Sequence, residues 1–167
     1  MKKTLEILNL LEQQGIIRKY AIGGAMGATF YVEPFTTFDL DVFVVLPKAD
    51  NALLLTLTPV YQFLASRGYL PEKECVLIEG VPVQFLPAYN PLLDEALEQA
   101  VDVMYDDVPT RVLTADHLAA IAVQTGRSKD RARIPMFLDS GALNRQRLDD
   151  ILARHGLTER WLQWTNL

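Results

Sequence analysis

The sequence predicts an α+β fold, with a small mixed β-sheet flanked by helices and a helical region at the C-terminal end. Short apolar runs bounded by glycine or proline predict strands, and longer runs with apolar residues at helical spacing predict helices. The predicted strands are residues 20–22, 38–46, 75–79, 81–86 and 108–113. Only helical patterns follow residue 113. We therefore divide the chain into an α/β core, residues 1–113, and a helical region, residues 114–167, packed on it as one compact unit.

The predicted helices are bounded by residues that favour helix termini. In the first, residues 3–14, apolar residues recur at near-helical spacing and Gly15 ends the run. Further helices are expected over residues 25–31, 52–67, 91–100 and 115–125. Ser128 is expected to cap the next helix, Ser140 or Asn144 precedes another, and a last helical segment finishes the chain.

The composition indicates a folded globular protein. Of 167 residues, half are apolar and 22% are charged. No apolar run reaches the roughly 18 residues that a membrane span needs, and the N-terminal segment is expected to be an amphipathic helix, not a signal peptide. The only cysteine, Cys75, excludes an intrachain disulfide, and with two histidines it does not favour a structural zinc site. A reducing cytoplasm is the expected compartment.

Charge is distributed unevenly along the chain. Residues 1–110 carry a balance of −8, and residues 111–167 carry +3, within a net charge of −5. The basic C-terminal third is suited to face a polyanionic ligand. The alternative is that these arginines lie on ordinary solvated helix faces.

A glycine pair and two alternating acids lie close together in the sequence. Gly23 and Gly24 follow the short strand at residues 20–22, and Asp39 and Asp41 lie at alternate positions of the next predicted strand. Residues i and i+2 of a strand face the same side, so both carboxylates are expected near the glycine turn. Backbone amides at a helix start favour an anion, and paired carboxylates favour a cation. The pattern indicates Mg²⁺ holding a nucleoside triphosphate.

The spacing of these residues, with Thr37 two positions before Asp39, resembles the signature of the minimal nucleotidyltransferase superfamily. The nearer likeness is to bacterial nucleotidyltransferase-like proteins, including those of abortive-infection-type toxin systems, although Met26 stands where alanine is common. The resemblance implies a polymerase-beta-like sheet and Mg²⁺-dependent transfer of a nucleoside monophosphate from an NTP to a hydroxyl. The acceptor (RNA, protein or small molecule) is left open, and a partner antitoxin protein is implied for relatives of the toxin kind.

A second part of the resemblance lies downstream. Such proteins often carry Gly-Arg-x-Lys-Asp after a helix, and this chain has Gly126, Arg127, Lys129 and Asp130 in that order. The lysine usual earlier in that helix is absent. The resemblance, which covers roughly residues 18–140, implies that nucleotide is bound by the two glycines, Thr37, Arg127, Lys129 and Asp130. It is equally open that Arg127 and Lys129 are surface residues of a helix start, and that Asp130 pairs with Arg133 or serves a helix N-terminus.

The chain departs from the family at the expected third carboxylate. The resemblance implies that Asp39 and Asp41 bind the metal and act in catalysis, with a third catalytic residue on a later strand. That position corresponds to Gln84, which is neutral and cannot accept a proton as a base. Loss of a general base removes about 10²–10⁴ in rate. Glu79, in the turn of the predicted hairpin, is the alternative acid. A weak enzyme and an inactive nucleotide-binding or protein-interaction module of the same fold both remain open.

Other polar residues carry simpler expectations. His117, in the first turn of its helix, and His155, near a helix C-terminus, are expected to be local polar residues without a catalytic role. Arg131 and Arg133 are expected on a solvated face. Trp161 and the nearby Trp164 are expected to pack the last helix on the body or on a partner.

Overall fold

The computed structural model describes residues 1–34, 36–37, 39–47 and 56–165. One mixed sheet runs through this part of the chain, with strand order β3-β4-β5-β2-β1-β7-β6. The strands are β1 (Lys19–Ile22), β2 (Leu40–Val45), β3 (Pro71–Glu72), β4 (Cys75–Ile78), β5 (Val81–Pro87), β6 (Val101–Tyr105) and β7 (Val108–Val112). The predicted α+β fold class is confirmed.

The register of the central strands sets the position of every later feature. β1 pairs with β2 in antiparallel fashion, with Ile22 opposite Val42. β5 lies on the other side of β2 and runs parallel to it, which places Gln84 directly opposite Asp41. The predicted hairpin of β4 and β5 is confirmed, and its turn residues Glu79 and Gly80 both have positive φ, as tight hairpin turns require.

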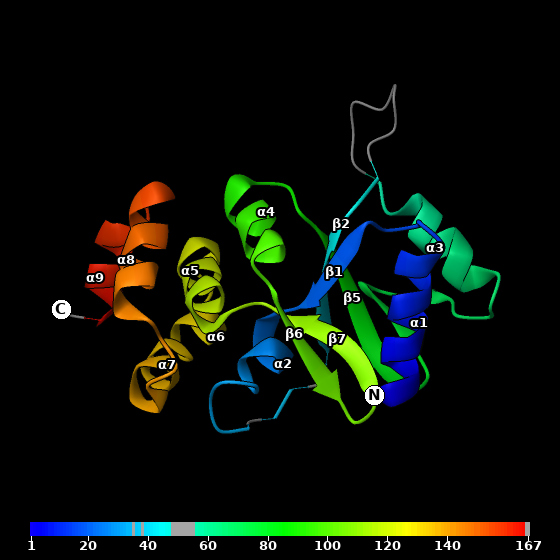
Figure 1. Ribbon diagram of the computed structural model, residues 1–167, viewed down its shortest axis with the longest axis horizontal. Coiled ribbons are helices and arrows are strands. Elements are labelled where there is room, and N and C mark those ends of the chain that lie inside the picture. The colour runs from blue at the N-terminus through cyan, green and yellow to red at the C-terminus, as the bar shows by residue number, and fades with distance from the viewer. Residues whose placement is uncertain (35, 38, 48–55, 166–167) are drawn as a thin grey trace.

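Helices cover both faces of the sheet (Figure 1). On one face, α1 (Lys2–Gln13) and α3 (Thr58–Ala65) form a buried core with the strands. On the other face, α4 (Pro91–Glu98) and α5 (Ala115–Thr125) share a second core with the sheet and the C-terminal helices. Successive side chains of β2 alternate between these cores: Val42 and Val44 join the first, and Phe43 joins the second.

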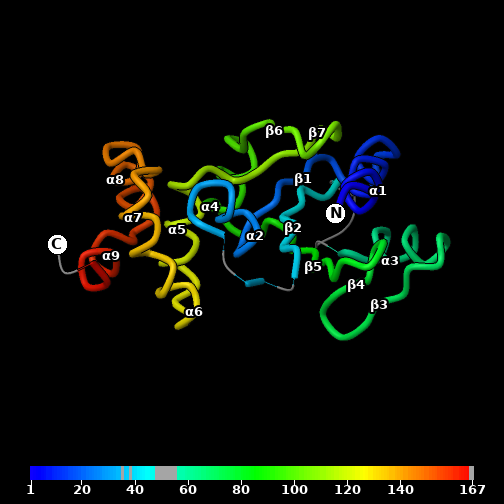
Figure 2. The backbone as a smooth tube through the Cα atoms, turned by 90° about the horizontal axis from the view of Figure 1, so that it is seen from below, coloured from blue at the N-terminus to red at the C-terminus, as the bar shows by residue number. Residues whose placement is uncertain are grey.

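The C-terminal helices gather at one end of the molecule, opposite α3, β3 and β4 (Figure 2). They are α6 (Ser128–Arg131), α7 (Ile134–Ser140), α8 (Arg145–Arg154) and α9 (Thr158–Thr165). The side chains of Thr114 and Asn144 cap α5 and α8, as predicted. Trp161 is buried in the core of this region, so α9 packs on the body of the protein as expected.

Several predicted boundaries need correction. Ser128 is the first residue of α6 and not its cap, which is Arg127. The single helix expected there is two helices, because Pro135 lacks an N–H and lies in the first turn of α7. The helix after the glycine pair, α2 (Gly24–Ala28), is shorter than residues 25–31.

Other differences concern strands and ends. The edge strands β6 and β3 were not predicted; most side chains of β6 are exposed, so it lacks the buried alternation that marks a strand. β2 begins at Leu40, and the predicted start at Phe38 lies outside the described residues. Residues 52–55 of the helix expected over 52–67 also lie outside them, and α3 begins at Thr58. Within the described residues, no helix is both long and apolar enough to cross a lipid bilayer.

Candidate active site

The glycine turn lies directly against the acidic strand. Gly24 has φ +56°, and a Cβ there would overlap the carboxylate of Asp41. A Cβ at Gly23 would overlap the ring of Phe43, and the Gly23 amide donates a hydrogen bond to the carbonyl oxygen of Asp41 at 2.9 Å. Glycine is therefore required at both positions for the β1–α2 turn to approach β2 this closely.

A cavity of about 500 Å³ opens beside this turn. Asp41 and its strand neighbour Gln84 line it, together with Asp39, which lies one residue before β2. The remaining polar lining comes from the segment before β2 and from the α6 region: Thr36, Thr37, Arg127, Lys129 and Arg133. Two acids, a neutral amide and three cations thus share one cavity beside the turn.

Asp41 is a carboxylate whose interactions within the protein are incomplete. In the described part of the chain, no group donates a hydrogen bond to it, and no cation lies within ion-pair distance of it. Burial raises its pKa above the usual range, while the positive charges of Arg127, Lys129 and Arg133 act in the opposite direction and Asp39 adds to the rise. An added cation between the two acids would relieve this unfavourable charge.

Asp130 differs sharply from Asp41 because every side of its carboxylate is occupied. It is 1% exposed and accepts hydrogen bonds from Thr125 Oγ1 at 3.0 Å, from Arg127 Nε at 2.5 Å, and from Arg133. Burial alone would raise its pKa, but the two arginines and Thr125 outweigh burial and lower it. Asp130 therefore holds both arginines at the cavity wall.

The sequence-predicted residues fall into two groups in the structure. Gly24, Thr37, Arg127 and Lys129 lie at the turn or line the cavity with the acids, whereas Asp130 lies behind the arginines. The structure contradicts the expectation that Arg133 is solvated: its side chain is 12% exposed, because Asp130 draws it inward. Sequence reasoning also missed Thr36, and only its place next to Thr37 could have indicated it.

Two further expectations were tested by the geometry. His117 is not a surface residue; it is fully buried, with its Nδ1 atom 2.8 Å from Thr114 Oγ1 and its Nε2 atom 3.4 Å from Glu95. The reason is that α5 packs between α4 and α8 and has almost no exposed face. Glu79, the alternative acid, accepts a hydrogen bond from Tyr69 at the turn end of β4, and it lines neither the 500 Å³ cavity nor a smaller cavity of about 140 Å³ beside it.

The donor set suits a hard cation that also binds substrate phosphates. Mg²⁺ is usually held by one or two carboxylates plus substrate oxygens, and Asp39, Asp41 and the Gln84 carbonyl offer oxygen donors alone. Across residues 1–34, 36–37, 39–47 and 56–165, no group of three or more His, Cys, Asp or Glu side chains is arranged to bind a metal ion. The set is thus suited to a cation completed by ligand, not to a closed structural metal site.

Comparison with solved structures identifies the class of fold. The chain has a fold of the nucleotidyltransferase type, which it shares with solved structures. No family model matches the sequence. No curated protein matches it either.

The similar structures are distant in sequence. The solution structure of the antibiotic-resistance factor ANT(2'')-Ia has 14% identity and a TM-score of 0.56, over 99% of this chain and 96% of that one. Its crystal structure with adenylyl-2''-tobramycin has 12% identity and a TM-score of 0.57, over 96% and 99%. An antigenic nucleotidyltransferase-like protein from Paracoccidioides brasiliensis also has 12% identity and a TM-score of 0.57, over 97% and 91%.

Proposed function

We propose that this protein is a Mg²⁺-dependent nucleotidyltransferase that moves a nucleoside monophosphate from an NTP to a hydroxyl group of an acceptor. The observation that carries the proposal is the state of Asp41. Its partly buried carboxylate lies against the glycine turn and accepts no hydrogen bond from the described residues, in a cavity whose opposite wall is basic. Such an arrangement is costly without a ligand and becomes favourable with a cation and a polyphosphate.

Each residue of the cavity has a role in this proposal. Asp39 and Asp41 would hold the metal, and the amides that follow Gly23 would donate hydrogen bonds to phosphate oxygens. Thr37, Arg127 and Lys129 bind the same phosphates, and Arg133 adds a fourth polar contact from the deeper wall. When bound, Mg²⁺ stabilises the negative charge that develops on the departing pyrophosphate. Asp130 orients the two arginines and does not itself contact the anion.

The reaction forms a bond between the acceptor oxygen and the α-phosphorus and breaks the bond from that phosphorus to pyrophosphate. The acceptor hydroxyl loses a proton to solvent or to the substrate, because Gln84 cannot take it and Asp39 and Asp41 would be engaged with the metal. General-base help of about 10²–10⁴ in rate is therefore missing. We expect slow turnover, with the Gln84 amide orienting the acceptor by hydrogen bonding.

The structural neighbours support the class of reaction. ANT(2'')-Ia was crystallised with adenylyl-2''-tobramycin, in which a nucleotide group is joined to another molecule. A chain of the same fold and nearly the same length, with paired acids at the glycine turn, is suited to the same type of transfer. The identity of the acceptor is not part of the proposal.

A second candidate function is favoured by one observation. Gln84 lies opposite Asp41, where a third acid would complete the catalytic set. A neutral residue there is also what an inactive nucleotide-binding or protein-interaction module would carry. In that case the cavity binds Mg²⁺ and NTP without turnover.

One experiment with matched variants tests both candidates. Purified protein is incubated with α-labelled NTPs, Mg²⁺ and acceptors of three kinds: tRNA, protein and small alcohols. We expect transfer of label that is abolished by Asp39→Ala and by Asp41→Ala, and that persists in Asp139→Ala, which changes an exposed acid on α7. Transfer that survives either of the first two changes would refute the proposed enzyme.

Calorimetry and one further substitution separate the two candidates. The enzyme and an inactive nucleotide-binding module both bind NTP in a Mg²⁺-dependent way, so a protein without such binding refutes both and leaves only a protein-interaction module. If the native protein binds but is inert, and Gln84→Asp creates transfer, the inactive module is supported. If the native protein transfers label and Gln84→Ala has no effect, the assignment of the third position to Gln84 is wrong.

A further inference from the structure

A second, smaller cavity of about 140 Å³ adjoins the first one. It lies between the sheet and the helices α4, α5 and α7. Most of its wall is apolar and comes from five different elements: Phe43, Leu86, Leu93, Leu118, Ile121 and Phe137. Because these side chains belong to regular, well-packed elements, the shape of the cavity is set by the fold and not by a loop.

This cavity reaches the reactive groups. Asp41, Gln84, Arg127 and Arg133 line both cavities, and Gly24 lines the smaller one. A molecule seated in the apolar part therefore has one end beside the carboxylate of Asp41. No separate entrance or second set of catalytic groups is needed for it to take part in the proposed reaction.

The size and lining of the cavity restrict what can fill it. An apolar cavity of roughly 150 Å³ accepts a ring the size of benzene. A charged group among the apolar side chains would lose its hydration without a partner, and the carboxylate of Asp130 is already neutralised by the arginines. A polycationic ligand would moreover lie next to Arg127 and Arg133, which repel it. The lining thus favours an uncharged, flat group.

One polar group is placed to recognise such a ring at its edge. Gln124 lines the cavity from the last turn of α5, and its carbonyl oxygen accepts a hydrogen bond from Asn90 at 3.0 Å. Asn90 is itself held because its own carbonyl oxygen caps α4 by accepting from the Leu93 amide. This arrangement leaves the amide nitrogen of Gln124 to donate to a ring nitrogen or oxygen.

We infer that the smaller cavity is a subsite for an uncharged planar ring that belongs to one of the two substrates, and that Gln124 donates a hydrogen bond to that ring. The inference rests on the proposed function and adds the chemistry of the substrate to it. The ring is either the base of the NTP or a ring next to the acceptor hydroxyl. Both sources share the same chemistry, and they differ in whether the ring arrives joined to the triphosphate.

Phenol is the probe for the ring alone. We expect phenol to shift the methyl NMR signals of Leu118 and Ile121, and Ile121→Phe, which fills the cavity, to weaken phenol binding at least about tenfold because the ring loses its buried surface. Leu138→Phe makes a comparable change at an exposed position of α7 outside the cavity and should leave binding unchanged. Leu86→Phe fills the cavity from β5 and repeats the test if Ile121→Phe does not fold. Equal phenol binding in the native protein and a folded cavity-filled variant, or none in the native protein, overturns the inference.

Gln124→Leu tests the hydrogen bond to the ring. It should weaken binding of phenol, whose oxygen can accept, more than binding of benzene, which has no acceptor. Equal losses for the two probes would remove Gln124 from the inference.

To find the source of the ring, we would compare the affinities of ATP and of inorganic tripolyphosphate for the protein, both titrated in the presence of Mg²⁺. If the ring is the base, ATP binds at least about tenfold more tightly than tripolyphosphate, phenol competes with ATP, and Ile121→Phe removes the advantage of ATP. If the ring belongs to the acceptor, the two bind alike and phenol still binds in the presence of ATP.

If phenol binds but neither polyphosphate does, the proposed function fails while the ring cavity stands. If both polyphosphates bind alike and phenol does not bind, the ring subsite fails while the proposed function stands.

Discussion

Two polar regions of the molecule use buried or partly buried carboxylates in opposite ways. In the helical part, Asp130 and Glu95 are surrounded by donors. On the central strand β2, the carboxylate of Asp41 is partly buried and receives no hydrogen bond from the described part of the chain. All three acids are close to arginines or histidines in the sequence or in space, so the difference lies in whether those groups reach the carboxylate.

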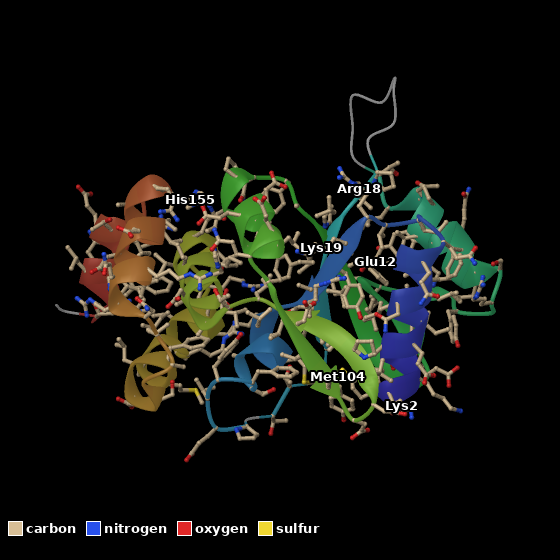
Figure 3. The ribbon with its side chains drawn as sticks, viewed as in Figure 1. Lys2, Glu12, Arg18, Lys19, Met104 and His155 are labelled. Carbon is tan, nitrogen blue, oxygen red and sulfur yellow. The ribbon has the colours of Figure 1, made fainter. Side chains whose placement is uncertain are left out.

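Glu95 shows how complete the pairing is on the helical side. It accepts hydrogen bonds from Arg154 at 2.6 Å and from His155 at 2.7 Å, and His117 approaches at 3.4 Å. Burial would raise its pKa, but these partners prevail and lower it to about 2. Figure 3 labels His155 on the side of α8 that faces α4, so this cluster joins three helices that are distant in sequence.

The contrast teaches how to separate structural acids from ligand-binding acids in this chain. A carboxylate with all its acceptor positions filled stabilises the fold and has little left for a ligand. A shielded carboxylate without donors destabilises the fold unless something outside the chain completes its coordination. Four measurements test this distinction. The first two replace a carboxylate that is fully hydrogen-bonded within the protein.

The largest effect is expected for Asp130→Asn. The change removes the charge that holds Arg127 and the mostly buried Arg133, and breaking such a buried pair costs about 3 kcal/mol of the free energy of unfolding. Urea denaturation measures it, with the exposed Asp139→Asn on α7 as the matched control. Nucleotide affinity should fall as well, because the arginines lose their orientation. A loss no greater than that of the control would mean that Asp130 does not hold the arginines.

Glu95→Gln is expected to come second, with a loss of about 2 kcal/mol, because a partly buried charge pair is broken and Arg154 keeps access to solvent. Glu95 lines neither cavity, so the affinity for Mg²⁺ and NTP should be unchanged. Glu98→Gln, at an exposed position of the same helix, is the control. Because the folded pKa lies near 2, below the usual 4.5, this stabilisation is present above pH 4.5 and is lost as the pH falls toward 2.

Asp41→Asn should act in the opposite direction, with a gain of about 1 kcal/mol in the unfolding free energy at pH 7 without ligand. Its pKa is raised by burial, so the charged form destabilises the fold above the usual pKa, and the gain should vanish in acid. Asp39→Asn, at an exposed position, should change stability little. Both substitutions should abolish Mg²⁺-dependent nucleotide binding. A destabilised Asp41→Asn protein would show that Asp41 has a structural partner.

The smallest effect concerns the pH dependence of stability near neutrality. Burial lowers the pKa of His117 below its usual 6.5, and the charge of Glu95 opposes this only in part. The unfolded chain therefore binds a proton before the folded one does, so stability falls as the pH drops below about 6.5, by less than about 1 kcal/mol between pH 7 and 6. His117→Gln should flatten this slope. An NMR titration of His117 with a midpoint above 6.5 would contradict the expectation.

Much of the central site was predictable because its parts are local. Gly23 and Gly24 follow an apolar run directly, and Asp41 lies two residues after Asp39, so strand periodicity alone puts that carboxylate near the turn. Gln84 was singled out by the family resemblance, and its place opposite Asp41 comes from the pairing of β5 with β2 in the structure. In each case a short stretch of chain carries the whole signal, and the register of neighbouring strands then follows from which residues must be buried.

Arg133, His117 and β6 could not be predicted in this way. Helical spacing assigned Arg133 to the solvent, but Pro135 ends that helix and Asp130 draws the arginine inward. His117 is buried because helices from distant parts of the chain enclose α5. The residues next to His117 do not indicate which helices these are. The side chains of β6 are mostly exposed, so its sequence lacks the alternation that predicts a strand. The strand forms through backbone pairing with β7.

The amino-acid pattern was therefore sufficient for the fold class, the glycine turn and the acids beside it, because these depend on the periodicity and sterics of short segments. Packing between segments far apart in the chain determined which carboxylates accept hydrogen bonds from arginine and histidine and which one does not. The same packing shaped the apolar cavity next to Asp41. The physical reason is that burial and pairing of a charge depend on every element that surrounds it, and a single stretch of sequence contains only one of them.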